Sequence, residues 1–244
     1  MKDKVIIITG ASSGIGRACA YFFSEQGGKV VLAARNTEKL KDIESELLAK
    51  SREVLAVTTD VSVEEDCQRL VEKTVTRFGG IDILINNAGL SMRGLFEHTQ
   101  LEVIKRLMDV NFWGTVYCTK YAMPYLLKAR GSVVGISSIA GFQGLPGRTG
   151  YSSSKFAMHG FLETLRVETL KKGLHVMIAA PGFTSTNVRK SALGPNGNVQ
   201  GESPRNESSM MSPEKVAKVI LKGITCRKHL IIMTTEGKFT VLMR

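Results

Sequence analysis

Tyr151 and Lys155 are the pair of side chains in this sequence with the clearest capacity for chemistry. Four positions apart on a helix, they lie on one face, so the ammonium group can act on the phenol. A free phenol has a pKa of about 10, and an adjacent positive charge lowers it by favouring the phenolate. Such a pair suits proton exchange with a carbonyl or alcohol oxygen.

Two serines precede this pair at a position where ligands often bind. Ser137 and Ser138 close an expected strand at 132–137, and a loop rich in glycine leads from them back to Tyr151. In open α/β sheets, ligands bind at the carboxyl ends of the strands. The sequence therefore predicts a polar site at that edge of the sheet.

A glycine-rich turn follows the first expected strand (5–8) and opens the first helix (14–26). It reads Thr9-Gly10-Ala11-Ser12-Ser13-Gly14-Ile15-Gly16, so the glycines are spaced G-x-x-x-G-x-G. Glycines let backbone N–H groups approach a ligand, and a helix N-terminus offers unpaired N–H donors to a diphosphate. The strand–turn–helix context favours dinucleotide binding over a plain connecting turn.

The end of the second strand (30–34) indicates which dinucleotide binds. No carboxylate stands there to hold the ribose 2′-OH of NAD(H), because the residues at 33–36 are Ala-Ala-Arg-Asn. Arg35 would pair with a 2′-phosphate in a charge-assisted contact. This favours NADP(H) over NAD(H), the alternative being that Arg35 is a solvated surface residue.

Two further segments at the same edge could contact the dinucleotide. Asp60, after the third strand (54–58), would accept from the adenine amino group, unless it or Ser62 caps the following helix. Asn86-Asn87-Ala88-Gly89 follows the fourth strand, and its small and amide side chains suit a wall beside the ribose and adenine. By itself this segment would be taken for a turn.

Short apolar runs alternate with amphipathic stretches along the chain. Strands are expected at 5–8, 30–34, 54–58, 83–86, 132–137, 175–179 and 230–233, and helices at 14–26, 38–50, 64–78, 101–110, 114–129, 151–171 and 213–224. Near-continuous apolar strands separated by helices indicate a parallel sheet covered on both faces. We therefore expect one α/β domain over 1–244 with a doubly wound, Rossmann-type sheet.

One long stretch interrupts this alternation. Residues 184–212 are rich in Ser, Asn, Gly and Pro and have no apolar period. A segment of this length inside a compact domain is typically a lid, a binding loop or a disordered segment. Its place directly after a strand end favours a substrate lid over a mobile surface insertion.

The composition excludes several classes of protein. The 244 residues are 43% hydrophobic and 23% charged, as in an ordinary globular chain, and no apolar run approaches the roughly 20 residues that span a bilayer. The net charge of +11 favours anionic partners, yet the basic residues are not clustered as a nucleic-acid site requires. The four cysteines form no C-x-x-C pair, which argues against disulfides and zinc. We expect a cytoplasmic protein that binds neither nucleic acid nor metal.

In combination, the motifs resemble those of the short-chain dehydrogenase/reductase family. The resemblance spans nearly the whole chain and is carried, in order, by Thr9-Gly10-x-x-x-Gly14-Ile15-Gly16, Asn86-Asn87-Ala88-Gly89, Asn111, Ser138, Tyr151-x-x-x-Lys155 and Pro181-Gly182. Within the family, residues 136–141 and 151–161 are most similar to the branch that handles steroid and other lipid-like ketones and alcohols. The resemblance implies an NADP(H)-dependent oxidoreductase.

The resemblance also implies roles for single residues. Tyr151 would exchange a proton with the substrate oxygen, and Ser138 would orient that oxygen. Lys155 would hold the nicotinamide ribose and lower the pKa of Tyr151, while Asn111 would hold a water that links Lys155 to solvent. The structural alternatives are that Asn111 kinks a helix and that Ser138 caps one. The positions implied in dinucleotide binding are Gly10, Ser12, Ser13, Gly14, Ile15, Gly16, Arg35, Asp60, Val61, Asn87, Ala88, Gly89, Tyr151, Lys155, Pro181, Gly182, Thr184 and Thr186.

One position departs from the family pattern. Many relatives that prefer NADP carry a basic residue in the glycine turn where this chain has Ser13, so Arg35 must discriminate nearly alone, with Arg17 close in sequence.

The implied reaction reduces a ketone or aldehyde, or oxidises the alcohol in reverse. The substrate pocket is expected to include Leu90, Met92, Phe142, Leu145 and Phe183, with core packing as the alternative for each. Two other functions fit the motifs. One is reduction of 3-oxoacyl groups on an acyl carrier protein that docks on the basic surface, and the other is non-catalytic dinucleotide binding. The resemblance further implies a homodimer or homotetramer formed through the helices at 114–129 and 151–171.

Overall fold

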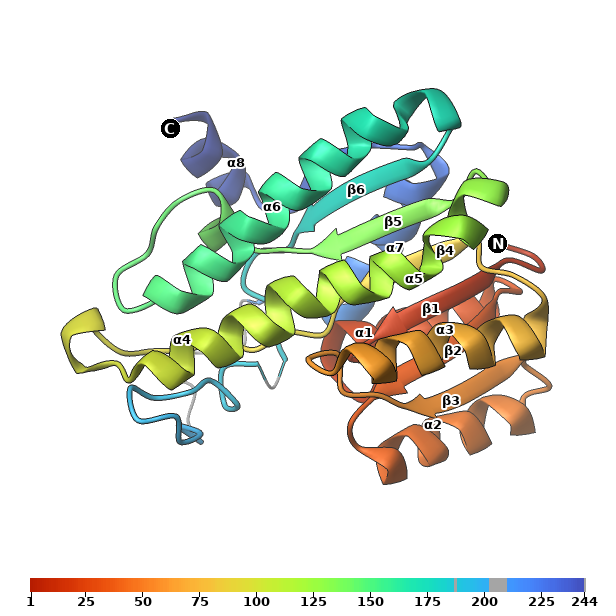
Figure 1. Ribbon diagram of the computed structural model, residues 1–244, viewed down its shortest axis with the longest axis horizontal. Helices are drawn as coiled ribbons and strands as arrows, with labels where there is room; N and C mark the ends of the chain where they lie inside the picture. Colours follow the sequence, from red (N-terminus) through yellow and green to blue (C-terminus); the bar gives the residue numbers. More distant parts are fainter. Residues whose placement is uncertain (187, 202–209, 244) are drawn as a thin grey trace.

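The computed structural model describes residues 1–186, 188–201 and 210–243 (Figure 1). Within them, seven parallel strands form one sheet in the order β3-β2-β1-β4-β5-β6-β7. The strands are β1 (Val5–Thr9), β2 (Lys29–Ala34), β3 (Val54–Thr58), β4 (Ile83–Asn86), β5 (Ser132–Ile136), β6 (His175–Ala180) and β7 (Leu230–Ile232). The helices are α1 (Gly14–Glu25), α2 (Thr37–Ala49), α3 (Glu64–Phe78), α4 (Leu101–Met108), α5 (Gly114–Lys128), α6 (Thr149–Thr169), α7 (Pro213–Thr225) and α8 (Thr235–Leu242).

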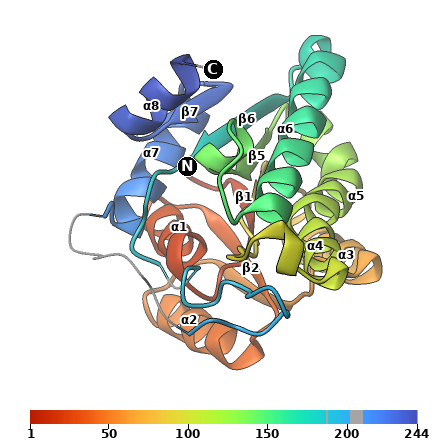
Figure 2. The same cartoon turned by 90° about the vertical axis from the view of Figure 1, so that its left-hand side faces the viewer.

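The sheet is buried on both faces, as its continuous apolar strands require. Successive side chains of a strand point to opposite faces, and in β1 this splits the isoleucines between two cores. Ile6 and Ile8 pack with residues of α1, α2 and α7, whereas Ile7 packs with residues of α3, α5 and α6. Figure 2 shows α1 and α7 on one side of the sheet and α5 and α6 on the other. The predicted doubly wound α/β fold is confirmed.

The order of the strands reverses next to β1. The chain runs from β1 outward to β2 and β3 and then returns to β4 on the other side, so that Ile7 of β1 pairs with Val31 of β2 and with Leu84 of β4. Such a reversal opens a crevice at the carboxyl ends of the two central strands. The glycine turn after β1 and the Asn87 segment after β4 meet at this point.

Two elements differ from those expected from the sequence. The helix expected at 101–110 ends at Met108, and a π-helical turn, η2 (Asp109–Trp113), joins α4 to α5. Helix α8 was not expected; it begins after Thr234, whose hydroxyl accepts from the Gly237 N–H at 3.1 Å. None of the helices in the described part of the chain combines the length and the apolar character that crossing a membrane requires.

Candidate active site

The glycine turn leaves the start of α1 open to a ligand. Gly10 (φ +66°) and Gly14 (φ +53°) take the left-handed conformation that glycine adopts readily. Ser13 precedes α1, but its side chain makes no capping bond, and the first turn holds no acidic residue. The first N–H groups of α1 therefore face the crevice with the positive end of the helix dipole behind them. Gly16 lies behind the turn, where a Cβ would overlap the Gly10 carbonyl oxygen.

A hydrogen-bond network ties the turn to β4. The Thr9 hydroxyl accepts from the backbone N–H groups of Asn87 and Ala88, each at 3.0 Å, and the Asn87 amide donates to the Thr9 carbonyl at 2.8 Å. Asn86 points the other way and donates to Thr119 Oγ1 at 3.1 Å in the interior. Asn87 therefore fixes the two sides of the crevice to each other.

Arg35 stands at the carboxyl end of β2 and lines the same crevice. Its side chain is exposed, and the next residue, Asn36, caps α2 by accepting from the Lys39 N–H at 2.9 Å. The side-chain oxygen of Asn36 is therefore occupied by this hydrogen bond to α2. Arg35 is thus the charged side chain that this strand end contributes to the crevice.

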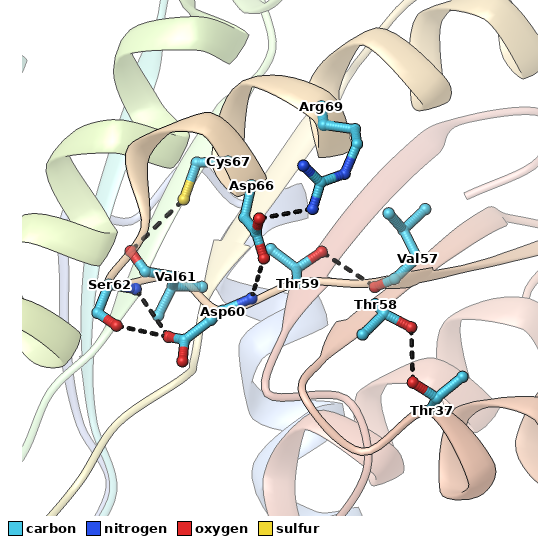
Figure 3. Close-up of polar contacts among 10 residues, drawn as sticks. All are labelled: Thr37, Val57, Thr58, Thr59, Asp60, Val61, Ser62, Asp66, Cys67 and Arg69. Carbon is cyan, nitrogen blue, oxygen red and sulfur yellow. Dashed lines mark hydrogen bonds and ion pairs between the residues drawn. The ribbon is translucent and has the colours of Figure 1, made fainter.

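Asp60 is held in a turn at the end of β3 (Figure 3). Its Oδ1 accepts from the backbone N–H of Ser62 at 3.0 Å and from the Ser62 hydroxyl at 2.6 Å. The Asp60 N–H donates to Asp66 Oδ2 at 2.9 Å, which lowers the pKa of Asp66, with Arg69 adding to the effect. The N-cap of α3 is Val63, without a side-chain capping bond. Neither Asp60 nor Ser62 therefore caps α3, and Asp60 stays at the cavity wall.

Lys155 is almost completely buried on α6. Its Nζ donates to the Ile136 carbonyl, the last of β5, at 2.9 Å, and lies 5.9 Å from the centre of the Tyr151 ring. Burial disfavours the charged amine and lowers the pKa of Lys155 to about 8. The lysine thus links α6 to the strand that precedes Ser138.

The pKa of Tyr151 is shifted in the direction opposite to the one expected. Burial of the phenol raises its pKa, and this outweighs the lowering by a hydrogen bond with Ser138 and by the positive charge of Arg148. The expected net lowering of this pKa is therefore wrong for the ligand-free chain. The physical reason is that the loss of hydration on burial exceeds the lowering by Ser138 and by the positive charge of Arg148.

Ser138 caps a short turn, the structural alternative considered from the sequence, and its role toward a substrate oxygen stays a prediction. It precedes a short 3-10 turn, η3 (Ile139–Gly141), and its Oγ accepts from the Ala140 N–H at 3.2 Å. Its hydroxyl also lowers the pKa of Tyr151. Because the Ala140 bond uses a lone pair of Oγ, the hydroxyl proton stays available for donation.

Asn111 is fully buried in the π-helical turn. Its Oδ1 accepts from the Leu90 N–H at 2.8 Å, and its Nδ2 donates to the Leu90 carbonyl at 2.9 Å and to Ser154 Oγ at 2.8 Å. The side chain thus joins the segment after β4 to α6. The water-holding role implied by the family resemblance stays a prediction.

The crevice holds a cavity of about 460 Å³. The predicted site residues that line it are Gly10, Ser12, Ser13, Gly14, Ile15, Arg35, Asp60, Val61, Asn87, Ala88, Gly89, Ser138, Tyr151, Lys155, Pro181, Gly182, Thr184 and Thr186. Gly16 and Asn111 are not among the lining residues and support it from behind. The dinucleotide-type turn and the Tyr151–Lys155 pair therefore share one cavity.

The residues predicted for the substrate pocket divide between the cavity and the hydrophobic cores. Leu90, Leu145 and Phe183 line the cavity, whereas Met92 and Phe142 are buried in the hydrophobic cores. Sequence alone could not distinguish these cases, because an apolar side chain suits a core and a pocket equally.

Two arginines that the sequence analysis did not identify also line the cavity. Arg148 lies three positions before Tyr151, directly before α6, and this nearness to Tyr151 in the sequence could have indicated it. Arg189 is buried and donates to the Thr184 carbonyl at 3.0 Å. No sequence motif marks this second arginine.

The segment at 188–201, which we call the strap, packs on the loop after β4. Leu193 forms a parallel bridge with Met92: its N–H donates to the Ser91 carbonyl, and its carbonyl accepts from Arg93 N–H, each at 2.8 Å. Ala192 and Leu193 are buried. Of the lid predicted at 184–212, residues 187 and 202–209 lie outside the described part of the chain.

The family model described as short chain dehydrogenase matches residues 4–195. Among curated proteins, an 11-beta-hydroxysteroid dehydrogenase-like 2 of Arabidopsis thaliana is 42% identical over 76% of this chain, which spans 60% of that relative's length. The dehydrogenase/reductase SDR family member 7B of Danio rerio is 33% identical over 99% of this chain and 81% of its own length.

Solved structures agree with the sequence relatives. A short-chain dehydrogenase/reductase from Burkholderia phymatum in complex with NAD has a TM-score of 0.89 at 26% identity, covering 100% of this chain and 93% of its own. An alcohol dehydrogenase from Thermococcus sibiricus, complexed with 5-hydroxy-NADP, has a TM-score of 0.79 at 28% identity, covering 89% and 88%. The fold, the order of the motifs and these relatives together establish that the chain belongs to the short-chain dehydrogenase/reductase family, with relatives of the 11-beta-hydroxysteroid dehydrogenase type.

Proposed function

We propose that this chain is an NADP(H)-dependent oxidoreductase that reduces a ketone or aldehyde and, in reverse, oxidises the alcohol. The observation that carries the proposal is the single cavity shared by the glycine turn, Arg35, Ser138, Tyr151 and Lys155. A nucleotide site and a proton-exchanging phenol in one cavity are what hydride transfer with proton transfer requires.

The residues around the turn fit a dinucleotide. The open N–H groups of α1 suit a diphosphate, Asp60 suits the adenine amino group, and Lys155 suits the nicotinamide ribose. Pro181 and Gly182 would lie beside the nicotinamide. When bound, the dinucleotide supplies or accepts the hydride, and the proton steps fall to this chain.

In the reductive direction, Tyr151 Oη gives its proton to the substrate oxygen while Ser138 donates a hydrogen bond to the same oxygen. The Lys155 ammonium, held by the Ile136 carbonyl, stabilises the phenolate that remains. Oxidation of an alcohol uses the same atoms in reverse, with the Tyr151 phenolate as the base. Tyr151 is therefore the proposed general acid and base.

The role of Tyr151 is tested by Tyr151→Phe. The variant should bind NADPH like the parent and lose turnover by at least about a hundredfold, since general acid–base catalysis contributes on that order. Turnover would be followed at the absorbance band of the reduced nicotinamide over a panel of ketones, aldehydes and alcohols. Undiminished turnover would refute the assignment, and a parent inactive on the whole panel would favour the non-catalytic alternative.

The preference for NADP(H) rests on Arg35. Arg35→Asp should weaken NADPH binding by about tenfold to a hundredfold and improve NADH binding, because a charge-assisted bond to the 2′-phosphate becomes a repulsion. Nicotinamide fluorescence titrations of the parent and of Arg35→Asp, each with NADPH and with NADH, measure these affinities. Equal affinities of the parent for NADPH and NADH would refute the argument.

The proposed substrate is apolar or lipid-like, with one reacting oxygen. Leu90, Leu145, Phe183 and Val188 give the substrate end of the cavity apolar surface, and the relatives named for 11-beta-hydroxysteroid dehydrogenase suggest steroid-like ketones. Segment 184–212 is proposed to border this substrate. Activity only on 3-oxoacyl groups attached to an acyl carrier protein would select the carrier-protein reductase instead.

Assembly and compartment form part of the same proposal. A homodimer or homotetramer would pack through the outer faces of α5 and α6. Trp113, which directly precedes α5, is 43% exposed and stacks on Tyr117 of that helix. Light scattering during gel filtration tests this, and a monomer at micromolar concentration would refute it. The scattered cysteines, without a C-x-x-C pair, favour a reducing compartment such as the cytoplasm.

A further inference from the structure

Arg148 occupies the junction between the helix that carries Tyr151 and the loop after β4. It precedes α6 directly, and its carbonyl accepts from the Ser152 N–H at 2.7 Å. Its Nη1 donates to Ser91 Oγ at 2.7 Å and also to the Met92 carbonyl. One guanidinium nitrogen therefore holds two points of the neighbouring loop against the start of α6.

The loop held in this way is part of a larger wall. Ser91 and Arg93 pair through their backbones with Leu193 of the strap. Below them, a small hydrophobic cluster of Met92, Val103, Leu107 and Leu193 packs with Leu90 and Tyr151. Arg148 thus connects the reacting phenol, the loop after β4 and the strap.

The charge of Arg148 also acts on the phenol. Among the described residues that line the cavity, the charged groups are Arg148 just before α6, Lys155 of α6, Arg189 of the strap, Arg35 after β2 and Asp60 after β3. Arg35 and Asp60 follow strands that lie on the other side of β1 from β5. The loop after β4 contributes Leu90 and Ser91, and the loop after β5 contributes Ser138; these are uncharged. The positive charge of Arg148 lowers the pKa of Tyr151 against the effect of burial.

We propose that Arg148 is a positioning residue for the reaction of the proposed function, fixing the substrate wall to α6 and keeping a positive charge beside the reacting phenol. The proposal rests on the proposed function for its kinetic consequences. The two roles need different properties of the side chain. Only a guanidinium has the planar set of donors that suits two acceptors in fixed directions, whereas a lysine keeps the charge as a single point.

The two roles are separated by Arg148→Lys and Arg148→Met, with Arg106→Met on the exposed face of α4 as the control for loss of one charge. In Arg148→Met, the pH midpoint of kcat should rise by about one unit because the cation is lost, and KM should rise about tenfold because the wall loses a charged hydrogen bond. Arg148→Lys should have a pH midpoint of kcat close to that of the parent, because it keeps the charge, but a KM raised as in Arg148→Met. Arg106→Met should leave both unchanged.

A titration that needs no turnover makes the proposal independent of the proposed function. The phenolate absorbance of the ligand-free parent minus that of Tyr151→Phe gives the titration curve of Tyr151 with Arg148 present. The absorbance of Arg148→Met minus that of the double variant Arg148→Met/Tyr151→Phe gives the same curve without the Arg148 cation. The midpoint should be higher without Arg148. Equal midpoints with and without Arg148 would overturn the proposal. A parent with the expected titration but no turnover on the panel would refute the proposed function alone.

Discussion

Replacing Lys155 by methionine should make the ligand-free protein more stable at neutral pH while removing its activity. The side chain is buried, and its pKa falls from 10.5 to about 8. The folded state therefore binds fewer protons than the unfolded state between pH 8 and 10.5, so parent stability rises with pH through that window. Integrating this dependence of stability on pH shows that the buried Lys155 lowers the unfolding free energy by about 3 kcal/mol at pH 7 and by about 1 kcal/mol at pH 10.

Methionine avoids this cost and fills a similar volume. It leaves the Ile136 carbonyl without its donor, a loss of about 1 kcal/mol. Lys155→Met should accordingly exceed the parent in unfolding free energy by about 2 kcal/mol at pH 7, with the advantage gone near pH 10. Turnover should be lost because the Lys155 ammonium no longer stabilises the Tyr151 phenolate or holds the nicotinamide ribose, as proposed above.

The assay is urea unfolding followed by far-UV circular dichroism at pH 7, 8, 9 and 10. Lys120→Met, on an exposed position of α5, serves as the matched control and should stay within about 0.5 kcal/mol of the parent at each pH. A stability difference for Lys155→Met that is independent of pH, or a variant less stable than the parent at pH 7, would refute the argument from burial.

Two further substitutions probe the supports of the cavity. Thr9→Val should lower the unfolding free energy by about 2 kcal/mol and weaken NADPH binding, whereas Thr9→Ser should retain both, because the hydroxyl accepts two backbone N–H groups after β4; equal denaturation curves for Val and Ser would contradict this. Asn111→Ala should cost about 3 kcal/mol, because it leaves both backbone groups of Leu90 without their side-chain partner. Urea unfolding measures that loss, and a change below about 0.5 kcal/mol would contradict it.

The strands and most helices were predictable because burial on both faces of a parallel sheet imposes a pattern that the sequence shows directly. Residues 5–8 are four consecutive β-branched side chains, and β1 adds one residue to them. The π-helical turn was foreseen only as the alternative that Asn111 kinks a helix, and the bonds that Asn111 makes there join Leu90 and Ser154, residues distant in sequence. Helix α8 had a local signal in Thr234, which the sequence analysis did not use.

The candidate site was predictable where a motif joins residue type to spacing, as in the glycine turn and the Tyr151–Lys155 pair. It was not predictable where the tertiary structure decides the role. The direction of the Tyr151 pKa shift depends on burial, which has no signature in a single residue. Met92 and Phe142 are buried in the cores whereas Leu90 lines the cavity, a difference that their common apolar character does not reveal.

The pairing of the strap with the loop after β4 uses main-chain atoms, with Leu193 bonded to the carbonyl of Ser91 and the amide of Arg93. Main-chain bonds of this kind tolerate exchange of the side chains that they present. The substrate end of the cavity can therefore be resurfaced through evolution or engineering at strap positions such as Val188, while Tyr151 and Lys155 on α6 keep their geometry. Under the proposed function, selectivity and chemistry would reside on separate pieces of the chain, so one could diverge while the other stays constant.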